Sequence, residues 1–203
     1  MSRTISFGSL IGGVLLFLVV SGGQGAQSSA VTSPPEQTQT QQSQDHQLSL
    51  YNTHTGERLE IIYRQGEKYV PAALARLDYF LRDHNTGDIR HFDPRLYDTL
   101  YDLTASIGQP SGEIDIVCGY RTPKTNESLR AHTAGVAKNS LHIQAEAIDL
   151  RMPGIDTLKL REAALALQRG GVGYYPHSNF IHVDTGRVRQ WCFDCPASLR
   201  GGD

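Results

Sequence analysis

Two short stretches, AIDLRM (147–152) and FIHVD (180–184), decide how this chain folds and where its chemistry lies. Both alternate like β-strands, in which successive side chains point to opposite faces. Asp149 therefore points to the face opposite that of its two apolar neighbours. His182 and Asp184 share one face of their strand, and their apolar neighbours point to the other. A carboxylate or imidazole in an apolar strand is costly to bury unless it is paired or bound to a metal. These strands thus predict a polar site on a small sheet.

A third residue completes a candidate metal site. His142 lies seven residues before Asp149, in the tripeptide Ser-Leu-His. With His182 it supplies a second imidazole, and two imidazoles with one carboxylate suit zinc and leave its fourth position open for water. Spacing alone also allows a simpler interpretation, in which a His–Asp hydrogen bond only stabilises the sheet.

The surrounding pattern indicates an α+β domain. A hairpin is expected at 48–63, with strands at 113–119, 147–152, 172–175 and 180–184. Helices are expected at 72–84, 96–107 and 156–168. The middle helix is the clearest, because its leucines recur at helical spacing between Asp93-Pro94 and Gly108. Helices come first and a small strand-rich sheet follows.

Three segments of different composition divide the chain. Residues 1–26 combine Arg3 with an apolar run and small residues, which predicts an export signal or an uncleaved N-terminal anchor. In residues 27–47, 16 of 21 positions are Gln, Ser, Thr or Pro, so this segment is expected to be a disordered linker that tethers the domain. Residues 48–203 form the expected working domain, which would lie outside the cytoplasm, in the periplasm or cell envelope.

Composition and cysteine usage narrow the function classes. Charged residues make up 20% and hydrophobic residues 39% of the 203 positions, which is typical of globular proteins. The net charge is −2 and no long basic run occurs, so nucleic acid is not an expected partner. Cys192 and Cys195 form a CxxC, for which a local disulfide is expected in an exported protein. Cys118 is expected to be buried and inert, although a disulfide from it to one of these two stays open.

The quoted strands belong to three blocks that together resemble a known family. SLHIQAEAIDLRMPG and GGVGYYPHSNFIHVDTGRVRQW, with CGYRTPKTNESLR upstream, look like the murein endopeptidase K type. That group belongs to the clan of zinc D-alanyl-D-alanine carboxypeptidases, lysostaphin-like enzymes and hedgehog domains. The resemblance covers about residues 48–192. It implies a small antiparallel sheet that carries a zinc site, with packed helices.

The resemblance also implies a function and a set of site residues. It implies a periplasmic zinc hydrolase acting on peptide cross-links of peptidoglycan, with His142, Asp149 and His182 as metal ligands. An arginine after a strand contacts substrate in the clan, and the matching residue is Arg121. For Arg121 a simple salt bridge in a loop is the alternative. We expect a monomer, with a possible membrane tether through residues 1–26.

The chain departs from the clan at two positions. Ala145 stands where many members have glycine, a change expected to be tolerated if φ there is below zero. Asn179 stands where many relatives place an acidic base, and an amide cannot take a proton. Asp184 is therefore the expected base, with His177 as runner-up, although Asp184 could instead orient His182.

These observations predict a zinc-dependent murein endopeptidase. Zinc lowers the pKa of bound water toward about 7, and a base accepts its proton. Two rival functions stay open, namely a D,D- or L,D-carboxypeptidase that trims stem peptides and a catalytically idle zinc-containing module that binds the wall.

Overall fold

The computed structural model describes residues 44–193 and 195. The expected signal at 1–26 and nearly all of the linker at 27–47 lie outside these residues. The first strand begins at Asp45, three residues before the expected domain start at 48. In the described part of the chain, no helix has the length and apolar character needed to cross a membrane.

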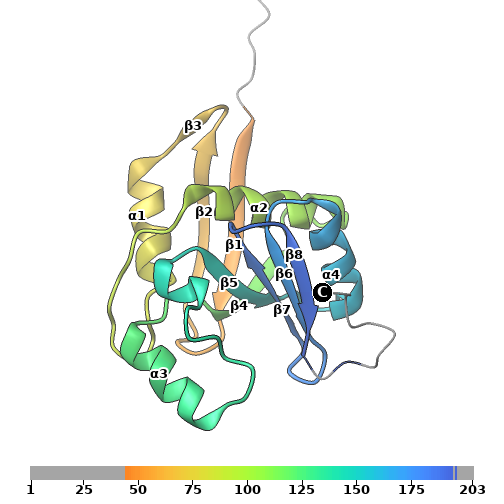
Figure 1. Ribbon diagram of the computed structural model, residues 1–203. Helices are drawn as coiled ribbons and strands as arrows, with labels where there is room; N and C mark the ends of the chain where they lie inside the picture. Colours follow the sequence, from red (N-terminus) through yellow and green to blue (C-terminus); the bar gives the residue numbers. More distant parts are fainter. Residues whose placement is uncertain (1–43, 194, 196–203) are drawn as a thin grey trace, which may run out of the picture. The chain divides into compact units, whose positions relative to one another are not determined.

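Eight strands form one mixed sheet in the order β3-β2-β1-β4-β5-β7-β6-β8 (Figure 1). Their bounds are β1 Asp45–Asn52, β2 Arg58–Gln65, β3 Lys68–Tyr69, β4 Glu113–Cys118, β5 Ala147–Arg151, β6 Gly171–Tyr175, β7 Phe180–Asp184 and β8 Arg189–Cys192. The α+β class is confirmed, as are the hairpin and the four further strands.

The expectation of a small antiparallel sheet is wrong in both size and direction. β1 pairs parallel with β4, and β6 pairs parallel with β8. Parallel neighbours need a long crossover connection, and the chain supplies one between β1 and β4 through β2 and two helices. This pairing joins the N-terminal hairpin to the strands that carry the candidate ligands.

Within residues 44–193, four α-helices and one 3₁₀ helix accompany the sheet. They are α1 Pro71–Phe80, α2 Pro94–Ser106, α3 Pro123–His132, η1 Leu141–Gln144 and α4 Thr157–Ala166. The expected helices correspond to α1, α2 and α4, with α1 ending four residues early. α3, η1, β3 and β8 are additions that the sequence pattern did not indicate. Figure 1 shows α1 beside the β1–β2 hairpin, α4 on the side of β6, and α3 apart from both.

Helix caps explain where two of these helices begin. The Asp93 carboxylate accepts a hydrogen bond from the backbone N–H of Arg95 at 3.0 Å and so caps α2. The Asp156 carboxylate caps α4 in the same way through the N–H of Leu158 at 2.9 Å. Each cap satisfies backbone N–H groups that have no partner within the helix and so fixes where the helix begins.

The strand register assembles one continuous apolar face. Directly paired residues share a face, and Ile116 pairs with Leu150, Leu150 with Ile181, and Ile181 with Tyr174. α1, α2 and α4 contact this sheet, and their buried residues belong to the same core as these strand residues. The other face of the same strands is therefore free to carry polar groups.

Candidate active site

One row of paired residues crosses that second face. Cys118 pairs with Asp149, Asp149 with His182, His182 with Gly173, and Gly173 with Trp191. Each residue comes from a different strand, so the register alone brings residues up to 73 positions apart onto one line. Two of the three expected metal ligands are direct neighbours in this row.

Cys118 joins the row because of an irregularity in β4. The register between β4 and β5 shifts between Ile116 and Cys118. Without the shift Cys118 would lie on the apolar face with Ile116; the bulge turns it toward Asp149. Its Sγ, a ring nitrogen of His142 and a carboxylate oxygen of Asp149 all lie within 4.8 Å of one another. Cys118 is only partly buried and contributes to the cleft wall, which corrects the expectation that it is buried.

The cysteine pairing follows the local expectation. Cys192 and Cys195 form a disulfide, and Cys118 is free. The disulfide joins the last residue of β8 to a cysteine three positions later. It therefore fixes the chain immediately beyond Trp191, with Cys192 on the apolar face, where it pairs with Tyr174.

The remaining expected ligand, His142, comes from η1. The Ser140 hydroxyl accepts a hydrogen bond from the backbone N–H of His142 at 3.4 Å and starts this short helix. The His142 ring is buried, with 1% of the residue exposed. Its Nδ1 lies 2.7 Å from the carbonyl oxygen of Gly119, at the end of β4. The ring is thereby aimed with Nε2 toward the strand row.

Three side-chain atoms converge above the row. His142 Nε2 lies 3.1 Å from Asp149 Oδ1 and 3.1 Å from His182 Nδ1, and His182 Nδ1 lies 2.8 Å from Asp149 Oδ1. The structure thus brings together all three residues that the sequence analysis selected as ligands.

The outer partners of the two imidazoles decide which atoms face one another. His142 Nδ1 must carry the hydrogen, because its partner Gly119 O only accepts. His182 Nε2 likewise donates to Asp184 Oδ2 at 3.0 Å. Each imidazole therefore turns its lone pair toward the Asp149 carboxylate. One proton could relieve only one of these contacts, whereas a metal cation satisfies all three, so the donor set fits a divalent ion.

Burial and neighbouring charges shift the pKa of all three groups. Burial lowers the pKa of His142, which favours the neutral, ligating form. Burial acts in the same direction on His182, but its contacts with the carboxylates of Asp149 and Asp184 outweigh it and raise the pKa. Burial opposes ionisation of Asp149, yet its contacts with both imidazoles dominate and lower its pKa. The site therefore holds an ionised carboxylate that attracts a cation.

The two departures from the clan both adopt left-handed backbone. Ala145 ends η1 with φ +57°, so the condition of a negative φ is not met. A residue with a Cβ in this region costs on the order of 1 kcal/mol relative to glycine. Asn179 has φ +54°, which asparagine tolerates well, and its side-chain oxygen accepts a hydrogen bond from Thr157 Oγ1. Asn179 is thus held away from the ligands by a helix residue.

Asp184 lies behind His182, on the side opposite the convergent atoms. Its oxygens accept hydrogen bonds from His182 Nε2, from both terminal nitrogens of Arg189 at 3.0 and 2.7 Å, and from the N–H groups of Gly171 and Gly186. Burial would raise its pKa, but these donors lower it. The other candidate base, His177, is exposed in the turn between β6 and β7 and is absent from the described cleft lining.

Arg121 lies at the edge of the site with its charge unpaired. It follows β4, is 8% exposed, and donates from Nη2 to Ser140 Oγ at 3.4 Å. Its Nε is buried without a partner. Within residues 44–193 and 195 no carboxylate forms a salt bridge with it, which removes the alternative of a simple loop ion pair. A buried guanidinium without an anion is costly, so the cleft is suited to an anionic ligand.

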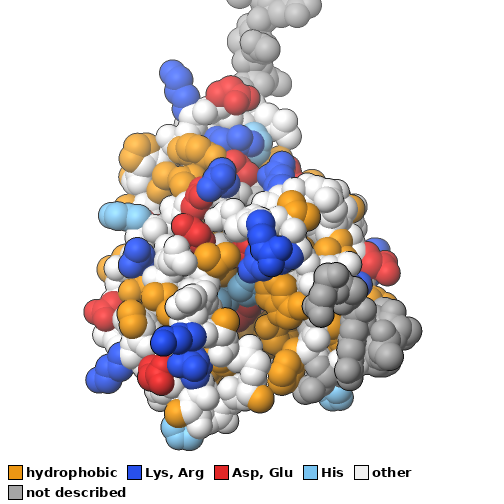
Figure 2. All heavy atoms as spheres, viewed as in Figure 1, with side chains coloured by type: hydrophobic (Ala, Val, Ile, Leu, Met, Phe, Trp, Pro, Cys, Tyr) orange, Lys and Arg blue, Asp and Glu red, His pale blue; other side chains and the backbone are white. Residues whose placement is uncertain are grey.

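These groups lie in a cleft of about 530 Å³. Figure 2 shows histidine atoms at the base of a recess, with hydrophobic surface beside them. One wall is aromatic, from Tyr175, Phe180, Trp191 and Phe193, and the opposite end carries the stacked rings of His54 and His84, 3.9 Å apart. Trp191 was not among the site residues predicted from the sequence, although it is the only tryptophan in the chain.

Comparisons with known proteins agree with this geometry. The family described as "Peptidoglycan L,D-endopeptidase MepK" matches residues 40–191. The chain is 45% identical over 144 residues to "Probable peptidoglycan L,D-endopeptidase MepK" of Haemophilus influenzae, covering 71% of this chain and 77% of that relative. It is 43% identical over 144 residues to "Peptidoglycan L,D-endopeptidase MepK" of Escherichia coli K12, covering 71% and 79%. The family match includes His142, Asp149, His182 and Arg121.

Proposed function

Because the chain belongs to the peptidoglycan L,D-endopeptidase MepK family, we propose that it is a zinc-dependent hydrolase that cuts peptide cross-links of peptidoglycan. The observation that carries the proposal is the convergence of three lone pairs, from His142, Asp149 and His182, beside an unpaired buried arginine. The first feature suits a divalent cation, and the second suits an anionic substrate.

His142, Asp149 and His182 would hold the metal, and their two nitrogens and one oxygen are the donor set of many catalytic zinc sites. Zinc in such a site supplies Lewis acidity, which polarises a carbonyl and lowers the pKa of a bound water toward about 7. The protein holds the donors ready, because Gly119 O fixes one imidazole and Asp184 the other. Cys118, also near these atoms, has a pKa that burial raises to about 12, so its thiol stays protonated.

Arg121 would bind a carboxylate of the substrate. In a peptidoglycan cross-link the scissile nitrogen is attached to a carbon that also bears a carboxylate or its amide. A guanidinium that is buried and unpaired before binding can form a two-pronged hydrogen bond with such a carboxylate. This contact would place the scissile amide against the ligand cluster. The family name specifies an L–D bond, which favours the 3–3 link between two diamino acids over the 4–3 link from D-alanine.

Asp184 would act by positioning His182. Its two oxygens are already occupied by five donors, and it faces the ring nitrogen that points away from the ligand cluster. This arrangement supports the alternative role considered for Asp184, that of an orienting partner. His177, being exposed outside the described cleft lining, is not supported as a base.

A location in the periplasm or cell envelope follows from the proposed substrate. Export through residues 1–26, a tether through the same segment and a monomeric state remain predictions.

The proposal is tested by digesting defined dimers. Purified protein is incubated with 3–3 and 4–3 cross-linked muropeptide dimers, and the products are weighed by mass spectrometry. We expect loss of the 3–3 dimer, inhibition by a chelator and recovery on adding zinc. Release of a single terminal amino acid with the dimer intact would instead identify a carboxypeptidase. Stoichiometric zinc with both dimers unchanged would identify a binding module.

A further inference from the structure

The hydroxyl of Tyr175 is held in a defined orientation at the cleft wall. The indole Nε1 of Trp191 lies 3.0 Å from the Tyr175 oxygen. An indole N–H can only donate, so the phenol oxygen must accept, and its own hydrogen is left for another partner. Within the described residues no acceptor lies in reach of that hydrogen. Tyr175 therefore offers a free hydrogen-bond donor to whatever fills the cleft.

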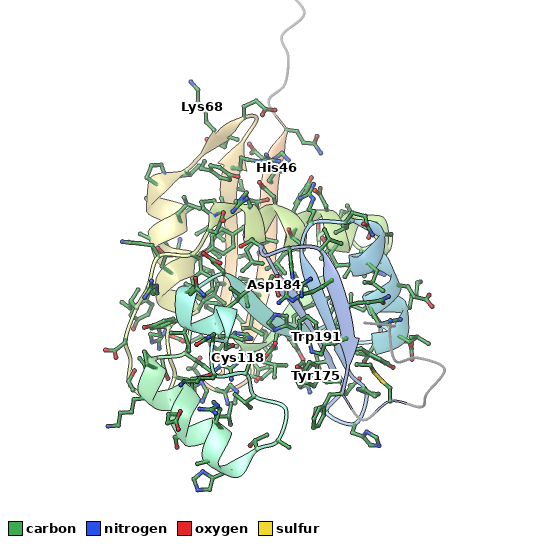
Figure 3. All side chains as sticks on the ribbon, viewed as in Figure 1. His46, Lys68, Cys118, Tyr175, Asp184 and Trp191 are labelled. Atoms are coloured by element: carbon green, nitrogen blue, oxygen red, sulfur yellow. A yellow bond between two sulfur atoms is a disulfide. The ribbon has the colours of Figure 1, made fainter. Side chains whose placement is uncertain are left out.

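Aromatic packing fixes both members of this pair. The Tyr175 ring stacks on Phe180 at 4.5 Å between centroids. The Trp191 ring lies across Gly173, where an added Cβ would come within 2.5 Å of the indole, and its centroid is 5.0 Å from that of His182. The glycine thus lets the indole lie over the strand row, next to a ligand candidate. Figure 3 shows Tyr175 and Trp191 together on the β6–β8 side of the cleft, with Cys118 on the side of α3.

Burial keeps the Tyr175 hydroxyl a donor. Burial raises the pKa of Tyr175, the hydrogen bond from Trp191 lowers it, Asp149 raises it and Arg121 lowers it, with a raised pKa as the result. The phenol therefore stays protonated at neutral pH. Tyr175 lines the same cleft as Asp149 and as Arg121, the arginine proposed to bind substrate.

We propose that Tyr175 is a catalytic residue that donates a hydrogen bond to the carbonyl oxygen of the scissile amide as negative charge develops on it. The inference rests on the proposed function. When water attacks the carbonyl carbon, the electron pair of the C=O double bond moves onto oxygen. It returns when the C–N bond breaks, and the proton that the water gives up passes to the leaving nitrogen, so that a carboxyl group and an amine are formed. Tyr175 keeps its proton throughout and forms no covalent bond. A fixed donor aimed at that oxygen stabilises the transition state more than the ground state.

The test compares Tyr175→Phe with wild type on the 3–3 dimer. Loss of one such donor is expected to lower kcat by about 10²-fold with KM nearly unchanged. Zinc content, melting temperature and the Kd of chelator-treated protein for the uncut dimer should match wild type, because the ring and the ligands are retained. Trp191→Phe, which removes the donor that orients the phenol together with part of the ring over Gly173, leaves the phenol itself in place and should lower kcat less.

Tyr174→Phe is the matched control. It deletes the neighbouring hydroxyl, on the apolar face of the same strand, and should leave kcat unchanged. A kcat for Tyr175→Phe within about twofold of wild type would overturn the inference, as would an unchanged kcat with a weaker Kd. A wild-type protein that cuts neither dimer would instead reject the proposed function itself, so the two failures can be told apart.

Discussion

The two faces of strands β5 and β7 are buried to similar degrees, yet they hold opposite chemistry. On the helix side, Ile148, Leu150 and Ile181 are fully buried against apolar neighbours. On the cleft side, Asp149 and His182 are 8% and 7% exposed. The same two strands therefore bury apolar side chains on one face and polar side chains on the other.

This difference separates what stabilises the fold from what prepares the site. Burial of the apolar face contributes roughly 1.5–3 kcal/mol per large side chain. Burial of the polar face costs free energy until each group finds a partner, and the structure supplies partners to only part of it. Arg121 has none for its Nε, and the three ligand atoms present lone pairs to one another. The candidate functional site thus lies where buried polar residues lower the stability of the fold.

The largest effect should come from breaking the polar face at His142. His142→Ala removes one of three ligands, so we expect loss of bound zinc and no detectable hydrolysis of cross-links. Zinc is measured by elemental mass spectrometry and hydrolysis by chromatography of muropeptides. His132→Ala, on exposed α3, is the control and should keep both. A His142→Ala protein that still lyses cell walls would exclude this ligand set.

A substitution on the apolar face should lower the stability of the fold and leave zinc binding and activity unchanged. Leu150→Ala, one residue from Asp149, leaves a cavity in the core and should lower the free energy of unfolding by about 2–5 kcal/mol. Zinc content and kcat below the melting temperature should stay near wild type, because the ligand face is untouched. Denaturant unfolding measures the first and the dimer assay the second. Loss of zinc at full stability would show that the faces are not separable.

The sequence predicted these two faces better than it predicted how strands are joined. Period-two alternation around Asp149 and His182 was enough to select them, because each has apolar neighbours on both sides. The pairing of the two residues depends on register, which alternation does not contain. Cys118 was misjudged because a bulge reverses its face. The RQWC sequence of β8 has no apolar alternation, so Trp191 and its partner Tyr175 were not connected.

A smaller effect is expected behind the polar face, at Asp184. Asp184→Asn keeps the size of the side chain but replaces one acceptor with a donor, opposite His182 Nε2 or Arg189. Zinc affinity should fall by about 10–100-fold, because His182 is no longer held in its ligating orientation. Competition with a chelating dye measures this change. Asp115→Asn, which breaks an ion pair with Arg151, is the control and should leave zinc affinity unchanged.

The smallest effect concerns the pH dependence of stability, through Asp83. Burial raises the pKa of this carboxyl, but hydrogen bonds from Thr125 and from the N–H groups of Thr122 and Asn85 outweigh it and lower the pKa to about 2. A carboxyl whose pKa is lower in the folded protein adds stability above its unfolded pKa of about 4, and that part is lost as pH falls toward 2. The N–H of Thr122, 2.8 Å from Asp83 Oδ2, directly follows Arg121, so this carboxylate also holds the substrate-side loop.

Asp83→Asn should therefore be less stable than wild type at pH 6, with the gap shrinking between about pH 4 and pH 2. Urea unfolding of both proteins across this range measures the gap, and because metal release affects both, their difference isolates Asp83. A gap that stays constant over the whole range would mean that Asp83 titrates alike in the folded and unfolded chains.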